Sequence, residues 1–97
     1  MKEVNVKEVP DNAQLIDVRE VDEFAEVHAK GAVNLPLSNF ATLSDKIDPS
    51  QPIYLICRSG GRSAQAAEYL ESVRGWENIH NVVGGTTEWM QQGLLTE

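Results

Sequence analysis

The segment from Ile53 to Ala64 decides the fold, and it reads I-Y-L-I-C-R-S-G-G-R-S-A. Its first five residues are the most apolar run in the chain and predict a central strand covered on both faces, as in a parallel sheet. A polar loop with two glycines follows, and residues 63–73 then carry apolar side chains at helical spacing. This order predicts one unit of an α/β fold, in which ligands bind at the carboxyl ends of the strands. The residue at that end is Cys57.

Short strands and helices alternate along the rest of the chain. Apolar runs, or apolar residues alternating with polar ones, predict strands at residues 4–6, 15–18, 32–35, 53–57 and 79–83. Helical spacing predicts helices at residues 20–27, 63–73 and 86–92. A further short helix, capped by Ser38, is predicted to carry Phe40, Leu43 and Ile47 on one side. The alternation predicts an α/β class with a mostly parallel sheet.

Composition limits the possible classes of function. The 97 residues correspond to one domain, residues 1–97, and 15 acidic against 8 basic side chains give a net charge of −7. This acidic balance argues against a nucleic-acid partner, which selects a basic surface. No apolar run reaches the ~18–20 residues of a membrane span, and the N-terminus lacks the apolar core of a signal peptide.

The chain has one cysteine, Cys57. It cannot form an internal disulfide or a zinc site built from several cysteines, so we expect no metal and a reducing, cytoplasmic location. No apolar stripe is left over for a subunit interface, so a monomer is expected.

The loop after Cys57 has the features of an anion-binding site. Its glycines allow successive N–H groups to point inward, and the following helix adds the positive end of its dipole. Arg58 and Arg62, two of only four arginines, flank the loop in an acidic chain. Cations and a helix N-terminus lower the pKa of a thiol, so Cys57 is expected to be a thiolate near neutral pH. A plain core cysteine, the alternative interpretation, does not explain R-S-G-G-R after the strand.

Three blocks of sequence resemble a known family. They are L-I-D-V-R-E-V-D-E-F-A-E-V-H-A-K-G-A-V-N-L-P at residues 15–36, C-R-S-G-G-R-S-A at 57–64 and N-V-V-G-G-T-T-E-W at 81–89. In this order and spacing they resemble the rhodanese-like single-domain sulfurtransferases. The resemblance implies a five-stranded, mostly parallel sheet flanked by helices on both faces. It also implies that Cys57 takes a sulfane sulfur from a donor such as thiosulfate and passes it, as a persulfide, to cyanide or to a small or protein thiol.

The resemblance and the loop chemistry together assign roles to residues. Cys57 carries the persulfide, and the two loop arginines orient thiosulfate and stabilise the leaving sulfite. The predicted binding loop comprises Arg58, Ser59, Gly60, Gly61, Arg62 and Ser63, the last also capping the helix. The reaction requires no metal or organic cofactor, because an ionised thiol needs neither for attack on sulfur.

Two alternative functions remain open. One is a sulfur relay that acts on a protein acceptor and reacts poorly with thiosulfate. The other, a cysteine-type phosphatase or arsenate reductase, is disfavoured because those loops have five residues between cysteine and arginine. Only four, residues 58–61, separate Cys57 from Arg62.

The remaining polar and aromatic residues receive structural interpretations. Asp17 is predicted to cap loop backbone, and Arg19 to pair with a neighbouring acid near the site. His28 is expected to make a hydrogen bond at a helix end, His80 to be exposed, and Trp89 to pack in the core. The acidic residues of the first helix, Glu20, Asp22, Glu23 and Glu26, are interpreted as a solvated face, and contact with a basic partner is the open alternative.

Overall fold

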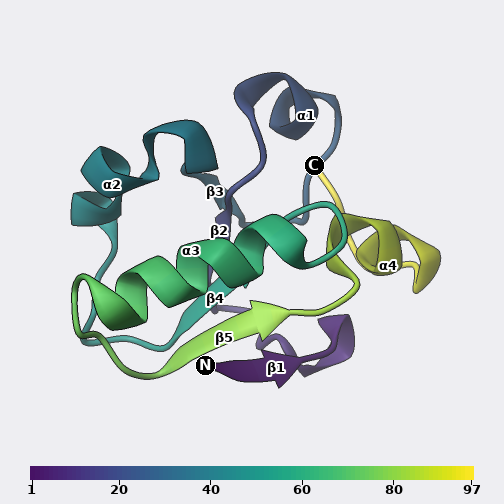
Figure 1. The fold of residues 1–97 in the computed structure, drawn as a ribbon. Coiled ribbons are helices and arrows are strands. Elements are labelled where there is room, and N and C mark those ends of the chain that lie inside the picture. Colours follow the sequence, from purple (N-terminus) through teal and green to yellow (C-terminus); the bar gives the residue numbers. More distant parts are fainter.

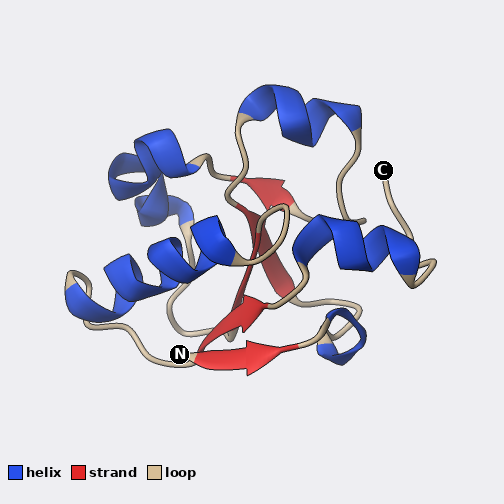
Figure 2. Ribbon diagram, turned by 45° about the vertical axis from the view of Figure 1, so that its right-hand side comes forward, coloured by secondary structure: helices blue, strands red, loops and turns tan.

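A computed structural model describes all 97 residues as an α/β fold built on one sheet. Every pair of neighbouring strands is parallel, and the strand order is β1-β5-β4-β2-β3 (Figure 2). The strands are β1 (Lys2–Val4), β2 (Gln14–Asp17), β3 (Val33–Asn34), β4 (Ile53–Ile56) and β5 (Ile79–Val82). The parallel five-stranded sheet that the sequence predicted is therefore confirmed, with β4 at its centre.

Four α-helices and three short 3-10 helices connect the strands. The α-helices are α1 (Val21–Glu26), α2 (Phe40–Leu43), α3 (Gly61–Ser72) and α4 (Gly85–Gln91). The 3-10 helices are η1 (Val6–Glu8), η2 (Leu37–Asn39) and η3 (Ser44–Lys46). Figure 1 shows α3, the longest helix, lying across β4 and β5, with α1 and α4 near the end toward which the strands point.

The central strand is buried on both faces, as its apolar run predicted. Ile53, Leu55 and Cys57 belong to the core beneath α2 and α3, whereas Tyr54 and Ile56 pack in a second core with Trp89 of α4. Successive side chains of a strand point to opposite faces, which produces this division. Because β4 is fixed from both sides, the residue that follows it has a well-defined position.

Three local predictions were wrong at element boundaries. Val6 lies in η1 and not in a strand, because the Asn5 side chain accepts from Lys7 N–H while Glu8 accepts from Asn5 N–H, forming a capping box. The helix expected after Ser38 is split into η2, α2 and η3. Ser38 caps none of them: its hydroxyl donates to Glu20 Oε1 at 2.7 Å.

No helix is both long and apolar enough to cross a membrane. The fold positions a single loop, between β4 and α3, at the carboxyl edge of its central strand.

Candidate functional site

Cys57 lies immediately after β4, and residues at the start of α4 contact its backbone carbonyl. Its carbonyl accepts from the Thr86 N–H at 2.8 Å and from the Thr86 hydroxyl at 3.1 Å. Gly85 approaches so closely that a Cβ there would lie 2.5 Å from the carbonyl oxygens of Cys57 and Arg58. Only a glycine fits this contact, which explains Gly85 as the first residue of α4.

The sulfur of Cys57 lies inside the loop. The residue is 1% exposed, although Arg58, Ser59 and Gly61 around it are exposed. The Gly60 N–H donates to Sγ at 3.0 Å, and the Ser63 hydroxyl lies 3.3 Å from it. Burial acts to raise the pKa of the Cys57 thiol, but hydrogen bonds from Ser63, Gly60 and Ser59 outweigh it and lower the pKa below its ordinary value. The site therefore stabilises the thiolate relative to that of an ordinary cysteine.

The helix after the loop begins earlier than predicted. Gly60, at φ 112°, is the N-cap of α3, so Ser63 lies inside the first turn and does not cap it. The cap prediction for Ser63 was wrong because glycine takes the left-handed backbone position that starts the helix here. Ser63 consequently points its hydroxyl inward, to the sulfur.

A buried asparagine, Asn81 of β5, contacts both groups that lie nearest the sulfur, so the Ser63 hydroxyl divides its single proton between Asn81 and Cys57. Its Oδ1 accepts from the Ser63 hydroxyl at 2.5 Å, and its Nδ2 donates to the Gly60 carbonyl at 3.1 Å. The side chain is 2% exposed. Sequence reasoning assigned Asn81 no role, although a polar residue inside a predicted buried strand was an available signal.

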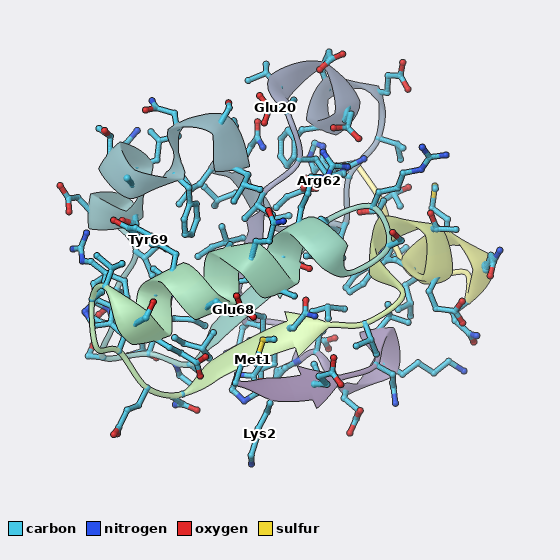
Figure 3. All side chains as sticks on the ribbon, viewed as in Figure 1. Met1, Lys2, Glu20, Arg62, Glu68 and Tyr69 are labelled. Atoms are coloured by element: carbon cyan, nitrogen blue, oxygen red, sulfur yellow. The ribbon has the colours of Figure 1, made fainter.

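The two loop arginines differ in their surroundings. Arg62 forms a two-pronged ion pair with Glu23 of α1, with N–O distances of 2.7 and 3.0 Å. This pairing lowers the pKa of Glu23 to about 2 and raises that of Arg62. Arg58 is exposed and makes no ion pair. Figure 3 shows Arg62 at the start of α3, directed toward α1.

A second ion pair, between Asp17 and Arg19, lies at the end of β2. Arg19 Nη2 donates to Asp17 Oδ2 at 2.8 Å and to the Val27 carbonyl at 2.7 Å. Asn34 of β3 donates to the Asp17 and Arg19 carbonyls at 3.0 and 2.9 Å. These contacts join β2, α1 and β3, and neither charged side chain makes a hydrogen bond with Cys57 or its loop.

Other polar residues have packing roles. His28 Nδ1 is 2.8 Å from the Phe24 carbonyl, a hydrogen bond at the end of α1. His80 was expected to be exposed but is buried: it stacks on Tyr54 of the neighbouring strand, with ring centroids 4.3 Å apart. Trp89 packs in the core as expected.

Comparison with known proteins places this geometry in a family. The Rhodanese-like domain model matches residues 4–92. A thiosulfate sulfurtransferase, GlpE, of Actinobacillus succinogenes is 32% identical over 90% of the chain and 78% of its own length. A putative sulfur carrier protein, YrkF, of Bacillus subtilis is 33% identical over 81% of the chain, and an uncharacterized protein, YqhL, of the same species is 43% identical over 79%. The chain spans 42% and 60% of these two proteins, respectively.

A solved structure agrees with the sequence matches. The rhodanese-related protein of Thermoplasma volcanium superposes with a TM-score of 0.88 at 28% identity, over 100% of this chain and 98% of that one. The resemblance of the three sequence blocks is thereby confirmed: the chain belongs to the rhodanese-like domain family.

Proposed function

We propose that this protein is a sulfurtransferase, in which Cys57 takes a sulfane sulfur from a donor and passes it to a nucleophilic acceptor. One observation carries the proposal: the Cys57 sulfur lies at the carboxyl end of β4 with the Gly60 N–H and the Ser63 hydroxyl directed at it. A thiolate is the nucleophile in attack on sulfur, and these donors stabilise that form.

The first half-reaction moves one sulfur atom onto Cys57. The thiolate attacks the sulfane sulfur of thiosulfate, a new S–S bond forms, and the S–S bond of thiosulfate breaks. Sulfite leaves with the bonding electron pair, and Cys57 carries a persulfide anion. No external oxidant or reductant is needed, because one S–S bond replaces another.

The second half-reaction releases that sulfur. Cyanide or a thiolate attacks the outer sulfur of the persulfide and departs as thiocyanate or as a new persulfide, while Cys57 returns to the thiolate. The inward N–H groups of the loop suit the terminal sulfur of the intermediate, because oriented amides stabilise negative charge. The loop from Arg58 to Ser63 is therefore proposed as the binding site for donor and intermediate.

A sulfur relay to a protein thiol is the second candidate. The GlpE and YrkF relatives are described as a thiosulfate sulfurtransferase and a putative sulfur carrier, so both types of relative match this chain. A free, unpaired cysteine fits a reducing compartment, so we propose that the domain acts in the cytoplasm. We also propose that it acts as a monomer.

Intact mass spectrometry tests the proposal. Incubation with thiosulfate is expected to add the mass of one sulfur atom to the wild-type chain, and cyanide is expected to remove it with release of thiocyanate. The Cys57→Ser variant should fold normally and show neither change, since it lacks the thiolate. Normal turnover in that variant would refute the proposed role of Cys57. Sulfur uptake by the wild type from persulfides but not from thiosulfate would favour the relay to a protein thiol.

A further inference from the structure

Two of the three arginines at the carboxyl edge of the sheet are paired with acids. Arg19 is matched by Asp17, and Arg62 is matched by Glu23. Arg58 is the cation that no acid neutralises. The loop therefore presents one uncompensated arginine to an incoming donor, although its sequence contains two.

The Glu23–Arg62 pair is positioned to affect donor binding. Arg62 lies in the first turn of α3, one residue before Ser63, whose hydroxyl contacts the Cys57 sulfur. The Arg62 and Glu23 side chains are 33% and 31% exposed, so both reach the surface where a donor arrives. Glu23 is ionised in the neutral range, as an ordinary glutamate is, and the Arg62 hydrogen bonds lower its pKa further, to about 2.

Resting on the proposed sulfur transfer, we infer that Glu23 determines donor preference by competing with the donor for Arg62. A dianion such as thiosulfate gains from a second cation, and it must share Arg62 with the Glu23 carboxylate to obtain one. A monoanionic sulfane donor, such as a persulfide or a thiosulfonate, is matched by Arg58 alone. Because Coulomb energy scales with the product of the charges, repulsion from Glu23 falls more heavily on the dianion.

Glu23 is thus a specificity-determining residue and not a catalytic one. It acts through Arg62 and is not itself within hydrogen-bonding distance of the sulfur. The pair is only partly buried, so water reduces its strength and the effect of Glu23 on donor choice is correspondingly moderate.

The test compares two donors that differ in charge. Thiosulfate is a dianion, and the methanethiosulfonate anion, CH3–SO2–S⁻, replaces one of its oxygens with a methyl group. Thiolate attack on either one breaks an S–S bond and releases sulfite or methanesulfinate. With cyanide as the acceptor, the kcat/KM for each donor reports the first half-reaction alone. Thiocyanate formation gives the rate with either donor.

Glu23→Gln is the informative variant. Glutamine keeps the oxygen that accepts from the Glu20 N–H, so the start of α1 is preserved while the charge is removed. The ratio of kcat/KM for thiosulfate to that for methanethiosulfonate is expected to rise roughly threefold to tenfold, mainly through the KM for thiosulfate.

Two further variants separate this explanation from a general charge effect. Glu26→Gln makes the same change of net charge on the same helix, but Glu26 is exposed and does not pair with Arg62. It is expected to leave the ratio within about twofold of the wild type, since isolated surface charges contribute little. Adding Arg62→Ala to Glu23→Gln is expected to cancel the rise in the ratio of kcat/KM for thiosulfate to that for methanethiosulfonate.

An unchanged or lower ratio in Glu23→Gln would overturn the inference, as would an equal loss of activity toward both donors. Binding of thiosulfate to unreactive Cys57→Ser chains, measured by calorimetry, gives an answer without turnover. There Glu23→Gln should tighten thiosulfate binding by a similar factor, and an unchanged affinity would refute the competition. If the wild type forms no persulfide with either donor while thiosulfate still binds in this way, the sulfur-transfer proposal fails and the anion competition stands.

Discussion

Two acid–arginine pairs lie near the carboxyl edge of the sheet. They consist of the same kinds of charged group but differ in burial and in their further contacts. In the Asp17–Arg19 pair the side chains are 0% and 6% exposed, and the arginine also holds the Val27 carbonyl. In the Glu23–Arg62 pair both side chains are about a third exposed, at 31% and 33%, and join only α1 to α3. A buried charge must be fully matched, whereas an exposed one can change partners. The first pair therefore has a structural role, whereas Arg62 of the second pair can exchange Glu23 for a bound anion.

Removing the arginine from each pair is expected to give the largest difference in stability between the two pairs. Arg19→Ala leaves the buried Asp17 without its partner and is expected to lower the free energy of unfolding by about 3–5 kcal/mol. Arg62→Ala exposes Glu23 to water and is expected to cost less than about 1 kcal/mol. Urea denaturation followed by circular dichroism measures both. Equal losses in the two variants would show that the pairs do not differ as described.

Exchanging arginine for lysine keeps the positive charge and tests the planar geometry of each pair. Arg19 contacts Asp17 through Nε and Nη2 and also reaches Val27, and a lysine ammonium cannot reproduce this planar arrangement. Arg19→Lys is expected to cost about 1–3 kcal/mol of unfolding free energy, because a buried acceptor loses its donor. Arg62→Lys should remain within about 0.5 kcal/mol of the wild type. The same urea titrations decide this, and a larger loss for Arg62→Lys would reverse the assignment.

The smallest expected effect is a dependence on pH. Arg62 lowers the pKa of Glu23 from 4.5 to about 2, so the carboxylate is favoured in the folded state. Its contribution to stability is complete above pH 4.5 and is lost as the pH falls through about 2. Glu23→Gln lacks this contribution at every pH. The difference in unfolding free energy between wild type and variant should therefore shrink across that window, and a constant difference would contradict the pairing.

The parts of the fold that depend on local pattern were predictable. The β4 run and the helical spacing of α3 are visible within a few residues, and they located the loop and Cys57 correctly. The η1 turn could also have been found, because Asn5 and Glu8 have the spacing of a capping box, which outweighs the alternation at Val6.

The rest depends on contacts between residues that are distant in sequence. Asn81 meets Gly60 and Ser63 from 21 and 18 positions away, and Glu23 meets Arg62 across 39 positions. A run of acids on a short helix is usually solvated, so nothing local distinguished Glu23 from Glu26. His80 was misjudged for the same reason: its burial follows from the register that places it beside Tyr54.

The contact between Gly85 and the backbone of Cys57 and Arg58 limits how the loop can evolve. Without room for even a Cβ behind those carbonyls, the loop cannot gain a residue by relaxing inward. Thr86 and Thr87 also donate to the same two carbonyls, so their orientation is fixed from α4. A longer loop, sized for a tetrahedral oxyanion such as phosphate, would therefore have to extend toward solvent, on the side where Arg58, Ser59 and Gly61 are exposed. The start of α4, far along the chain, thus fixes the base of this loop, and a change in loop length would alter only its exposed rim.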